Sequence, residues 1–359
     1  MINVTKSYLP PIEEYQKYLS KIWESSWLTN QGPLAQELEL RLKEHLGVKN
    51  LLFVSNGTIA VQLAIKALAL TGEIITTPFS YVATTTSILW ENCTPVFADI
   101  DRGTCCINPE QIESLITKKT SAILATHVYG IPCAVERIGE IAKKNKLKII
   151  YDGAHAFDVK YKGRSVFEYG DVSALSFHAT KLFHTVEGGA IITQDDELYK
   201  KILLYRSFGH IGDDYYTIGI NGKNSEFHAA MGLCNLSKIN DIIRRRKAIA
   251  KHYFSQLESL PLTFPRIPEH VEYNYAYFPV FFPDEDILNK VRSRLAEKQI
   301  NTRRYFYPSL NKLPYLTSSD QCPVSEDLAK RVLSLPFYPQ LTFEEVDMIC
   351  SLIKGMFTK

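Results

Sequence analysis

The segment LLFVSNGTIAVQLAIKALALTGEIITT, residues 51–77, contains the pattern that sets the architecture of the chain. Its runs LLFV and EIITT are short and largely apolar, as buried strands are, and IAVQLAIKAL between them is predicted to form a helix. A strand, a helix and a second strand in this order indicate a βαβ unit of an α/β domain.

The same rhythm continues to about residue 195. Further short apolar runs are predicted as strands at residues 95–99 (PVFAD), 121–127 (SAILATH), 148–152 (KIIYD), 173–177 (SALSF) and 189–193 (GAIIT). Helices such as the one predicted over residues 134–145 (AVERIGEIAKKN) separate them. Runs this apolar favour strands buried on both faces of a mostly parallel or mixed sheet, with ligands bound at the carboxyl ends of the strands.

The pattern changes after about residue 225. A long helix is predicted over residues 225–257, followed by a strand in YNYAYFPVFF and by helices over residues 286–298 and 343–354. We therefore expect a large α/β domain over residues 1–240, with an N-terminal arm over about 1–30, and a smaller α+β domain over 241–359. The basic run Arg244 to Lys247 is interpreted as a solvated helix face, with contact to an anionic substrate or partner as the alternative.

Composition limits the class of protein. The 359 residues are 45% hydrophobic and 22% charged, which suits about two globular domains and excludes fibrous and disordered chains. A net charge of +2 is too small for a protein that depends on nucleic acid or an anionic membrane surface. Residues 1–20 hold no apolar signal region, and no long uncharged apolar run occurs, so we expect a cytoplasmic protein.

The cysteines and histidines do not form a recognisable metal site. Seven cysteines include no C-x-x-C pair, which favours free buried thiols over a zinc site or a disulfide framework. His178 and His184 lack partners at ligand spacing, so both are expected to line or support a site of another kind.

Three polar segments lie at predicted strand ends. Ser55 to Thr58 joins a strand to a helix, an arrangement that suits a phosphate, although these residue types also serve as ordinary helix caps. Asp152 ends an apolar strand, where it could pair with a cationic ring nitrogen or cap a turn. Lys181 follows another strand end, close to Ser176, and could be a nucleophile or a surface lysine.

Together the three segments predict one kind of cofactor. A phosphate cup, a carboxylate that keeps a ring nitrogen protonated and a lysine that forms a Schiff base suit pyridoxal 5′-phosphate. Each segment is weak evidence alone, and their order along one α/β domain makes the combination stronger.

Four blocks of sequence resemble one known family. The blocks at residues 55–68, 75–101, 149–157 and 176–191 are similar to the signatures of the sugar-nucleotide aminotransferases, which have the fold type I architecture of pyridoxal-phosphate enzymes. The D-x-A-H block at Asp152 and the S-F-H-x-T-K block ending at Lys181 are the most specific. This resemblance implies a large domain with a mostly parallel seven-stranded sheet and a smaller α+β domain.

The resemblance also implies site residues. It makes Lys181 and Asp152 catalytic, and it assigns cofactor contacts to Gly57, Thr58, Tyr81, Asp152, Ala154, His155, Ser176, Lys181 and Asn221. Asn221 is expected to act across a homodimer with shared active sites, although Asn224 stands where the family commonly has Met. Residues expected to face the substrate are Thr29, Asn30, His184, Arg304, Tyr305 and Tyr307.

The reaction implied is transamination of a nucleotide-linked keto sugar. The expected substrates are L-glutamate and dTDP-4-keto-6-deoxyglucose, giving dTDP-4-amino-4,6-dideoxyglucose for a surface polysaccharide such as the O-antigen of lipopolysaccharide. Amination at C3 of a dTDP-3-keto-6-deoxyhexose, or at C4 of a GDP- or UDP-linked sugar, is the alternative. Related sugar dehydratases carry histidine in place of the Schiff-base lysine, so Lys181 argues against that reaction. A non-enzymatic regulator would not need the intact set Asp152, Ser176 and Lys181, which argues against that alternative as well.

Overall fold

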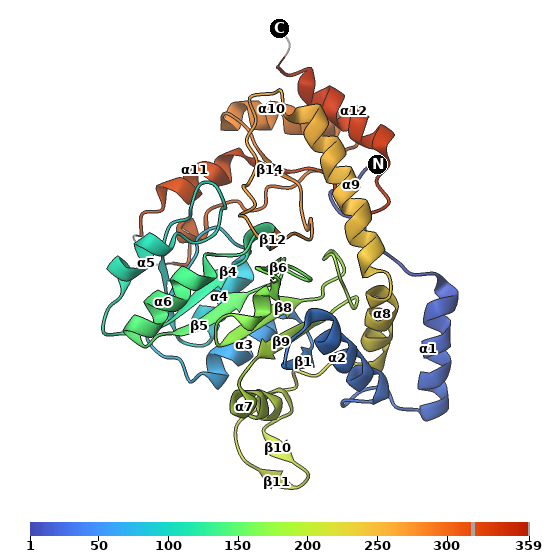
Figure 1. Ribbon diagram of the computed structural model, residues 1–359, viewed down its shortest axis with the longest axis vertical. Helices are drawn as coiled ribbons and strands as arrows, with labels where there is room; N and C mark the ends of the chain where they lie inside the picture. The colour runs from blue at the N-terminus through green and yellow to red at the C-terminus, as the bar shows by residue number, and fades with distance from the viewer. Residues whose placement is uncertain (317–319, 358–359) are drawn as a thin grey trace.

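A seven-stranded sheet forms the centre of the computed structural model, which describes residues 1–316 and 320–357 (Figure 1). Its strands are β1 (Asn50–Val54), β2 (Glu73–Thr76), β3 (Thr94–Phe97), β4 (Thr120–Thr126), β5 (Lys148–Asp152), β8 (Val172–Ser176) and β9 (Gly189–Thr193). They lie in the order β1-β9-β8-β5-β4-β2-β3. Because only β9 runs antiparallel to its neighbours in this sheet, the predicted mostly parallel seven-stranded sheet is confirmed.

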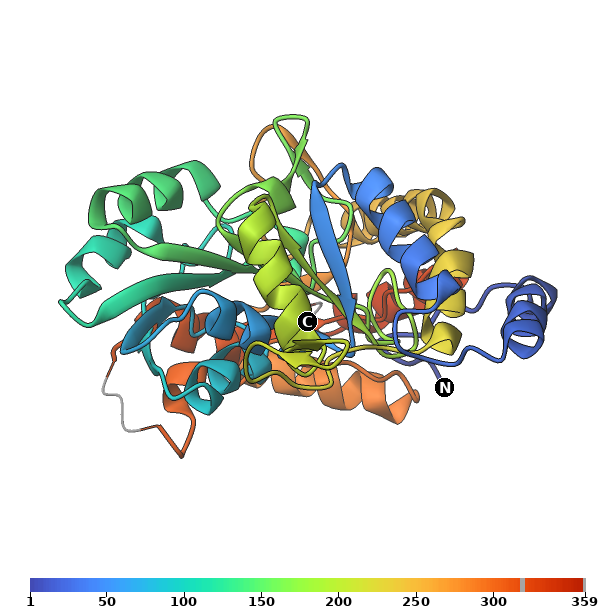
Figure 2. The ribbon, with the colours of Figure 1, turned by 90° about the horizontal axis from the view of Figure 1, so that it is seen from below.

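Helices cover both faces of this sheet (Figure 2). Strand residues alternate between the faces, so Leu52 and Val54 pack with α3 (Gly57–Ala67) while Leu51 and Phe53 pack with α2 (Pro33–Leu46). The other covering helices are α4 (Val82–Trp90), α5 (Pro109–Leu115), α6 (Val135–Asn145), α7 (Asp196–Arg206) and α8 (Glu226–Leu236). Strands buried on both sides explain why their sequences are continuous apolar runs.

Two segments extend from the body of the molecule. Helix α1 (Ile12–Ser25) lies at one edge beside α8, and the hairpin of β10 (His210–Ile211) and β11 (Asp214–Tyr215) projects at the end opposite the C-terminus (Figure 1). Both carry large apolar side chains in solvent, Trp23 being 70% and Tyr215 79% exposed. Large aromatic side chains left in solvent are typical of surfaces that meet another protein.

The C-terminal part has its own core. Helix α9 (Ile239–Leu257) leads to a layer made of β13 (Pro279–Phe281), β14 (Val332–Ser334), α10 (Glu285–Glu297), α11 (Pro323–Arg331) and α12 (Phe343–Lys354). Ile2 packs into this same core, so the first residues of the chain lie with the C-terminal part. The division of the chain at residue 240 stays a prediction.

The remaining elements are short. They are the three-stranded sheet of β6 (Lys160–Tyr161), β7 (Arg164–Ser165) and β12 (Val271–Glu272), and the 3₁₀ turns η1 (Val128–Gly130), η2 (Val166–Glu168) and η3 (Leu310–Lys312). No helix within residues 1–316 and 320–357 is both long and apolar enough to cross a membrane.

Two predictions about the region after residue 225 were wrong. The single helix predicted over 225–257 is divided into α8 and α9. At the break, the Ser237 hydroxyl donates to the Cys234 carbonyl, which in a continuous helix would accept from a backbone amide four residues later. The strand in YNYAYFPVFF shrinks to β13, because the Asn274 side chain binds the Ala276 amide and Tyr275 takes a positive φ.

The basic run of α9 is a solvated face only in part: Arg244 and Lys247 are exposed, but Arg245 and Arg246 bind other parts of the chain. Arg246 is buried, and it donates to the carbonyls of Tyr275 and Ala276, while Arg245 donates to the carbonyl of Leu341 at 2.8 Å. These arginines hold the C-terminal part to the helix by capping free backbone carbonyls. A charge run alone does not reveal such partners, because they lie far along the chain.

Candidate active site

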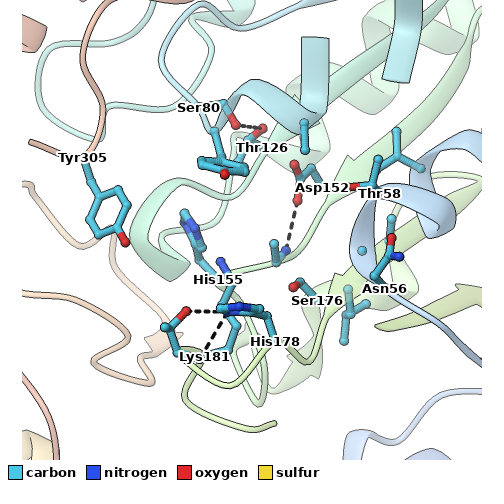
Figure 3. Close-up of a pocket in the computed structure, with 18 of the residues that line it drawn as sticks. Asn56, Thr58, Ser80, Thr126, Asp152, His155, Ser176, His178, Lys181 and Tyr305 are labelled. Carbon is cyan, nitrogen blue, oxygen red and sulfur yellow. Dashed lines mark hydrogen bonds between the residues drawn. The ribbon is translucent and has the colours of Figure 1, made fainter. Parts of the chain in front are cut away.

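A cavity of about 270 Å³ opens where β4, β5 and β8 end (Figure 3). This is the edge of the sheet at which the sequence predicts ligand binding. Residues expected to form the site that do line the cavity are Gly57, Thr58, Tyr81, Asp152, Ala154, His155, Ser176, Lys181 and Tyr305. The three polar segments of the sequence therefore meet in one space.

The N-terminus of α3 forms a cup on one side of the cavity. The Asn56 side chain caps the helix by accepting from the Ile59 amide at 2.9 Å. Within the part of the chain that the structure describes, the amides of Gly57 and Thr58 and the Ser176 hydroxyl make no hydrogen bond with protein. A Cβ on Gly57 would lie 2.8 Å from the Ser176 Cβ, so glycine keeps this cup open. Free amides at the positive end of a helix suit a phosphate.

Asp152 lies at the end of β5, and its side chain is held rigidly. One carboxylate oxygen accepts from the Thr84 hydroxyl at 2.6 Å, and the other accepts from the Ala154 amide at 3.1 Å. The Thr84 hydroxyl is itself 2.8 Å from Ser80, so a short chain of hydroxyls fixes the group. Asp152 is 8% exposed and faces the cavity, where it could bind a protonated ring nitrogen.

Lys181 lies in the turn that follows β8, and its amide donates to the His178 carbonyl at 2.8 Å. Its Nζ donates to the Tyr277 hydroxyl across 3.4 Å. Burial lowers the pKa of Lys181 from its usual value, while the negative charge of Asp152 partly opposes that shift. A lower pKa increases the neutral fraction of the amine, which is the nucleophilic form.

His155 has a tautomer set by its neighbours. Its Nδ1 accepts from the Tyr129 amide at 3.2 Å, so in the neutral ring the proton is on Nε2. Burial, and then the positive charge of Lys181, keep the pKa of His155 well below its usual value. The ring is packed parallel to Phe306 at a centroid distance of 5.6 Å. His155 is therefore a neutral donor at the cavity wall.

Arg304 and His184 are not directed into the cavity. Arg304 pairs with Glu285 at 2.8 Å. Successive side chains of an extended segment point to opposite sides, and since Arg303 lines the cavity, Arg304 points away from it. His184 is 2% exposed and its Nε2 lies 2.7 Å from the Tyr8 carbonyl, so it supports the N-terminal segment instead.

Four further expected residues also lie outside the cavity lining. Tyr307 is stacked beneath the Arg304 guanidinium, and Asn221 accepts from Lys223 at 2.8 Å on an exposed loop. Thr29 and Asn30 are exposed between α1 and α2. One chain alone does not bring these four residues to the cavity.

The side chains of the cavity wall that sequence reasoning missed include Tyr277, Arg303 and Phe306, which come from the C-terminal part of the chain. Tyr277 lies in the segment predicted as a strand, and Arg303 and Phe306 lie in the block NTRRYFYPSL that drew attention to their neighbours. Alternation along that block could have indicated that Arg303 and Tyr305 share a side. Among the described residues, no group of three or more His, Cys, Asp or Glu side chains could hold a metal ion.

A buried histidine next to this cavity predicts a pH dependence of stability. Burial lowers the pKa of His127 to about 3 in the folded protein, and unfolding returns it to about 6.5. The unfolded state therefore binds the extra proton first, and the free energy of unfolding falls as pH drops from about 6.5 towards 3. Between pH 6 and pH 4 we expect His127 to account for a loss of about 2 kcal/mol.

Denaturant unfolding of wild type and His127→Gln at both pH values measures this loss. Glutamine can still accept from the Cys133 amide, which donates to His127 Nδ1 at 3.0 Å. The variant should lose less stability than wild type over this interval. Equal losses in the two proteins would contradict the assignment.

The chain matches one protein family over nearly its whole length. The model of the DegT/DnrJ/EryC1/StrS aminotransferase family matches residues 11–354. A dTDP-4-amino-4,6-dideoxy-D-glucose transaminase of Shigella dysenteriae is 41% identical, with 98% of each chain covered. A GDP-perosamine synthase of Escherichia coli O157:H7 is 34% identical, again with 98% of each covered.

The fold also matches that of solved structures over nearly the whole chain. The crystal structure of DesI in the presence of its TDP-sugar product superimposes with a TM-score of 0.94 at 32% identity, covering 99% of this chain and 92% of that one. This agreement confirms the expected fold type I architecture. The chain belongs to the DegT/DnrJ/EryC1/StrS aminotransferase family.

Proposed function

We propose that this aminotransferase uses pyridoxal 5′-phosphate to move the amino group of L-glutamate to C4 of dTDP-4-keto-6-deoxyglucose. The products are 2-oxoglutarate and dTDP-4-amino-4,6-dideoxyglucose. The observation that carries the proposal is the meeting of the α3 cup, Asp152 and Lys181 in one cavity. The substrate is drawn from the transaminase of Shigella dysenteriae, to which the chain is similar over nearly its full length.

The residues of the cavity fit this cofactor. The amides of Gly57 and Thr58 and the Ser176 hydroxyl would hold its phosphate, because they are unpaired within the described chain and Gly57 leaves the cup open. Asp152 would bind the ring nitrogen, and the Nε2–H of His155 would donate to the ring hydroxyl. Tyr81 and Ala154 would cover the two faces of the ring. When bound, the cofactor supplies an electron sink for the carbon that loses a proton.

Lys181 would do the proton transfers. Its lowered pKa favours the neutral amine, which can take a proton from the α-carbon of glutamate and later deliver one to the sugar carbon. Tyr277 would help to fix the amine, since its hydroxyl lies 3.4 Å from Nζ. Asp152 holds a negative charge in place through both stages, anchored by Thr84 and the Ala154 amide.

A homodimer would complete the site. Asn221, Thr29 and Asn30 are exposed and lie outside the cavity of their own chain. The nearby α1 and the β10–β11 hairpin expose Trp23 and Tyr215, and large aromatic side chains left in solvent are typical of protein interfaces. We infer that these surfaces meet a second copy, where Asn221 reaches the cofactor phosphate.

We also infer a cytoplasmic enzyme that supplies an amino sugar for a surface polysaccharide such as O-antigen. All seven cysteines are free and buried, which is typical of proteins from a reducing compartment.

A panel of keto sugar nucleotides tests the substrate. The purified enzyme, loaded with cofactor and given L-glutamate, should aminate dTDP-4-keto-6-deoxyglucose with a higher kcat/KM than a dTDP-3-keto-6-deoxyhexose or GDP- and UDP-linked 4-keto sugars. The product's C4 nitrogen is identified by NMR. A preference for the GDP-linked sugar would point instead to the activity of the GDP-perosamine synthase relative. Inactivity with every dTDP-linked ketone would refute the proposed substrate.

A further inference from the structure

Arg303 is a cavity residue whose charge no other part of the described chain neutralises. It lines the cavity together with Lys181, Tyr277 and Tyr305. Its side chain makes no ion pair or hydrogen bond with any residue that the structure describes, and its guanidinium is packed over the Tyr305 ring at 4.7 Å. The adjacent Arg304 is paired with Glu285, so the two arginines have different roles.

The position of Arg303 relative to the reacting amine can be bounded through Tyr277. The Lys181 Nζ donates to the Tyr277 hydroxyl across 3.4 Å. The Tyr305 ring beneath the Arg303 guanidinium lies 5.5 Å from the Tyr277 ring, measured between centroids, so the guanidinium is on the same wall of the cavity as Tyr277. The cation therefore lies on the side of the cavity formed by Tyr305 and Tyr277, across from Asn56 and Thr58 of the α3 cup (Figure 3).

We propose that Arg303 binds the α-carboxylate of the amino-acid donor. In an α-amino acid the carboxylate is attached directly to the carbon whose proton Lys181 would remove, so it must lie close to Nζ. A planar guanidinium can bind both oxygens of a carboxylate at once, and its stacking on Tyr305 orients it for this contact.

Two other anions fit this position less well. The diphosphate of a nucleotide sugar is attached at C1, across the sugar ring from C4, and is therefore separated from the reacting carbon. The side-chain carboxylate of glutamate is two carbons beyond its α-carbon. In the sugar stage the same guanidinium faces uncharged hydroxyls, and its exposure to solvent lets it remain hydrated.

The inference rests on the proposed function only in requiring an α-amino acid donor, and it does not depend on which sugar is aminated. Its test uses the cofactor-loaded enzyme without any sugar. Stopped-flow absorbance gives the second-order rate constant of the amino-acid stage for L-glutamate, L-glutamine and L-isoglutamine. L-isoglutamine carries an amide in place of the α-carboxylate, and L-glutamine carries one in place of the side-chain carboxylate.

Arg303→Gln should lower the rate constant for L-glutamate by about tenfold to a hundredfold, which corresponds to the usual free-energy contribution of hydrogen bonds to a charged group. The preference for L-glutamate over L-isoglutamine should collapse in this variant, while the preference over L-glutamine should persist. Arg303→Lys, which keeps the charge without the planar fork, should recover part of the rate. Arg244→Gln removes a 77% exposed charge outside the cavity and should behave as wild type.

A binding measurement separates this role from catalysis. α-Methylglutamate has no α-proton to transfer, so an absorbance titration with it gives a dissociation constant without turnover. Arg303→Gln should raise that constant by a similar factor. Because Arg303 is exposed and unpaired within the described chain, the variant should fold and load cofactor as wild type does.

Several outcomes would overturn the inference. The first is that Arg303→Gln keeps the wild-type preference for L-glutamate over L-isoglutamine. The second is that it loses the preference for L-glutamate over L-glutamine instead. The third is that only the rate of the sugar stage falls, which would assign Arg303 to the diphosphate. If wild type reacts with a different amino acid, the proposed donor fails, and the same comparison made with that amino acid and its α-amide still decides the role of Arg303. If wild type reacts with no amino acid, both the donor and the inference are wrong.

Discussion

Lys181→Ala will abolish transamination, lowering kcat by at least about ten-thousand-fold. The variant loses the nucleophile of the cavity and its proton carrier together, and a positioned proton donor alone contributes up to about ten-thousand-fold. Two of its neighbours are poorly suited to replace it. His155 is held neutral with Nδ1 occupied by the Tyr129 amide, and Tyr277 has its pKa raised to about 12 by burial.

Absorbance spectra and product formation check this expectation. Wild type mixed with pyridoxal 5′-phosphate should turn yellow and bleach when L-glutamate is added, whereas Lys181→Ala should show only the spectrum of the free aldehyde. The matched control is Lys66→Ala, which removes an exposed lysine from α3 and should leave both spectra as in wild type. Turnover by Lys181→Ala at more than a hundredth of the wild-type rate would show that another group moves the proton.

The pH profile offers a second check on Lys181. Burial lowers its pKa, so the neutral amine becomes available at a lower pH than for an exposed lysine. The rate of the amino-acid stage should rise with pH and level off below the usual lysine pKa of about 10.4.

The sheet and the part of the cavity at its strand ends were predictable because they depend on local sequence. An apolar run between turn residues can only be a buried strand or helix, and the seven runs between residues 50 and 195 all became strands. Topology then brings their carboxyl ends together, so Gly57, Asp152 and Lys181 could be expected to meet from chain order alone.

Contacts made across long sequence distances were the ones that sequence reasoning missed. From the sequence, Arg246 is expected to be a surface charge, because the carbonyls of residues 275 and 276 that bind it lie about thirty residues further along the chain. Arg303 and Arg304 are indistinguishable by composition, and only the position of Glu285 decides which of them is paired. His184 could not be separated from a site histidine without knowing where the carbonyl of Tyr8 lies.

Asp152→Asn will lower kcat by about a hundredfold to a thousandfold, the usual cost of removing one preorganised electrostatic contact in an active site. An asparagine has nearly the same shape, and its carbonyl oxygen can still accept from Thr84 or the Ala154 amide. What it lacks is the negative charge that would keep a ring nitrogen protonated while electrons flow towards it. The loss should therefore fall mainly on kcat, with cofactor affinity reduced far less.

A chemical rescue distinguishes this electrostatic role from a structural one. Pyridoxal 5′-phosphate methylated at the ring nitrogen carries a permanent positive charge and needs no carboxylate to hold a proton there. Loading Asp152→Asn with this analogue should recover part of the lost kcat, although the added methyl group will weaken binding in wild type. Asp171→Asn is the matched control, since Asp171 lies beside the opposite ends of β5 and β8, where it binds the Ile149 amide at 2.8 Å and pairs with Lys148.

The control variant should lose stability while keeping its rate, because its carboxylate supports the sheet and does not line the cavity. If Asp152→Asn retains the wild-type kcat, the ring nitrogen does not depend on this carboxylate. If its rate is lost and the methylated cofactor restores none of it, Asp152 acts by shaping the end of β5 through Thr84 and the Ala154 amide. Only recovery with the charged analogue fits a carboxylate whose negative charge is what the reaction uses.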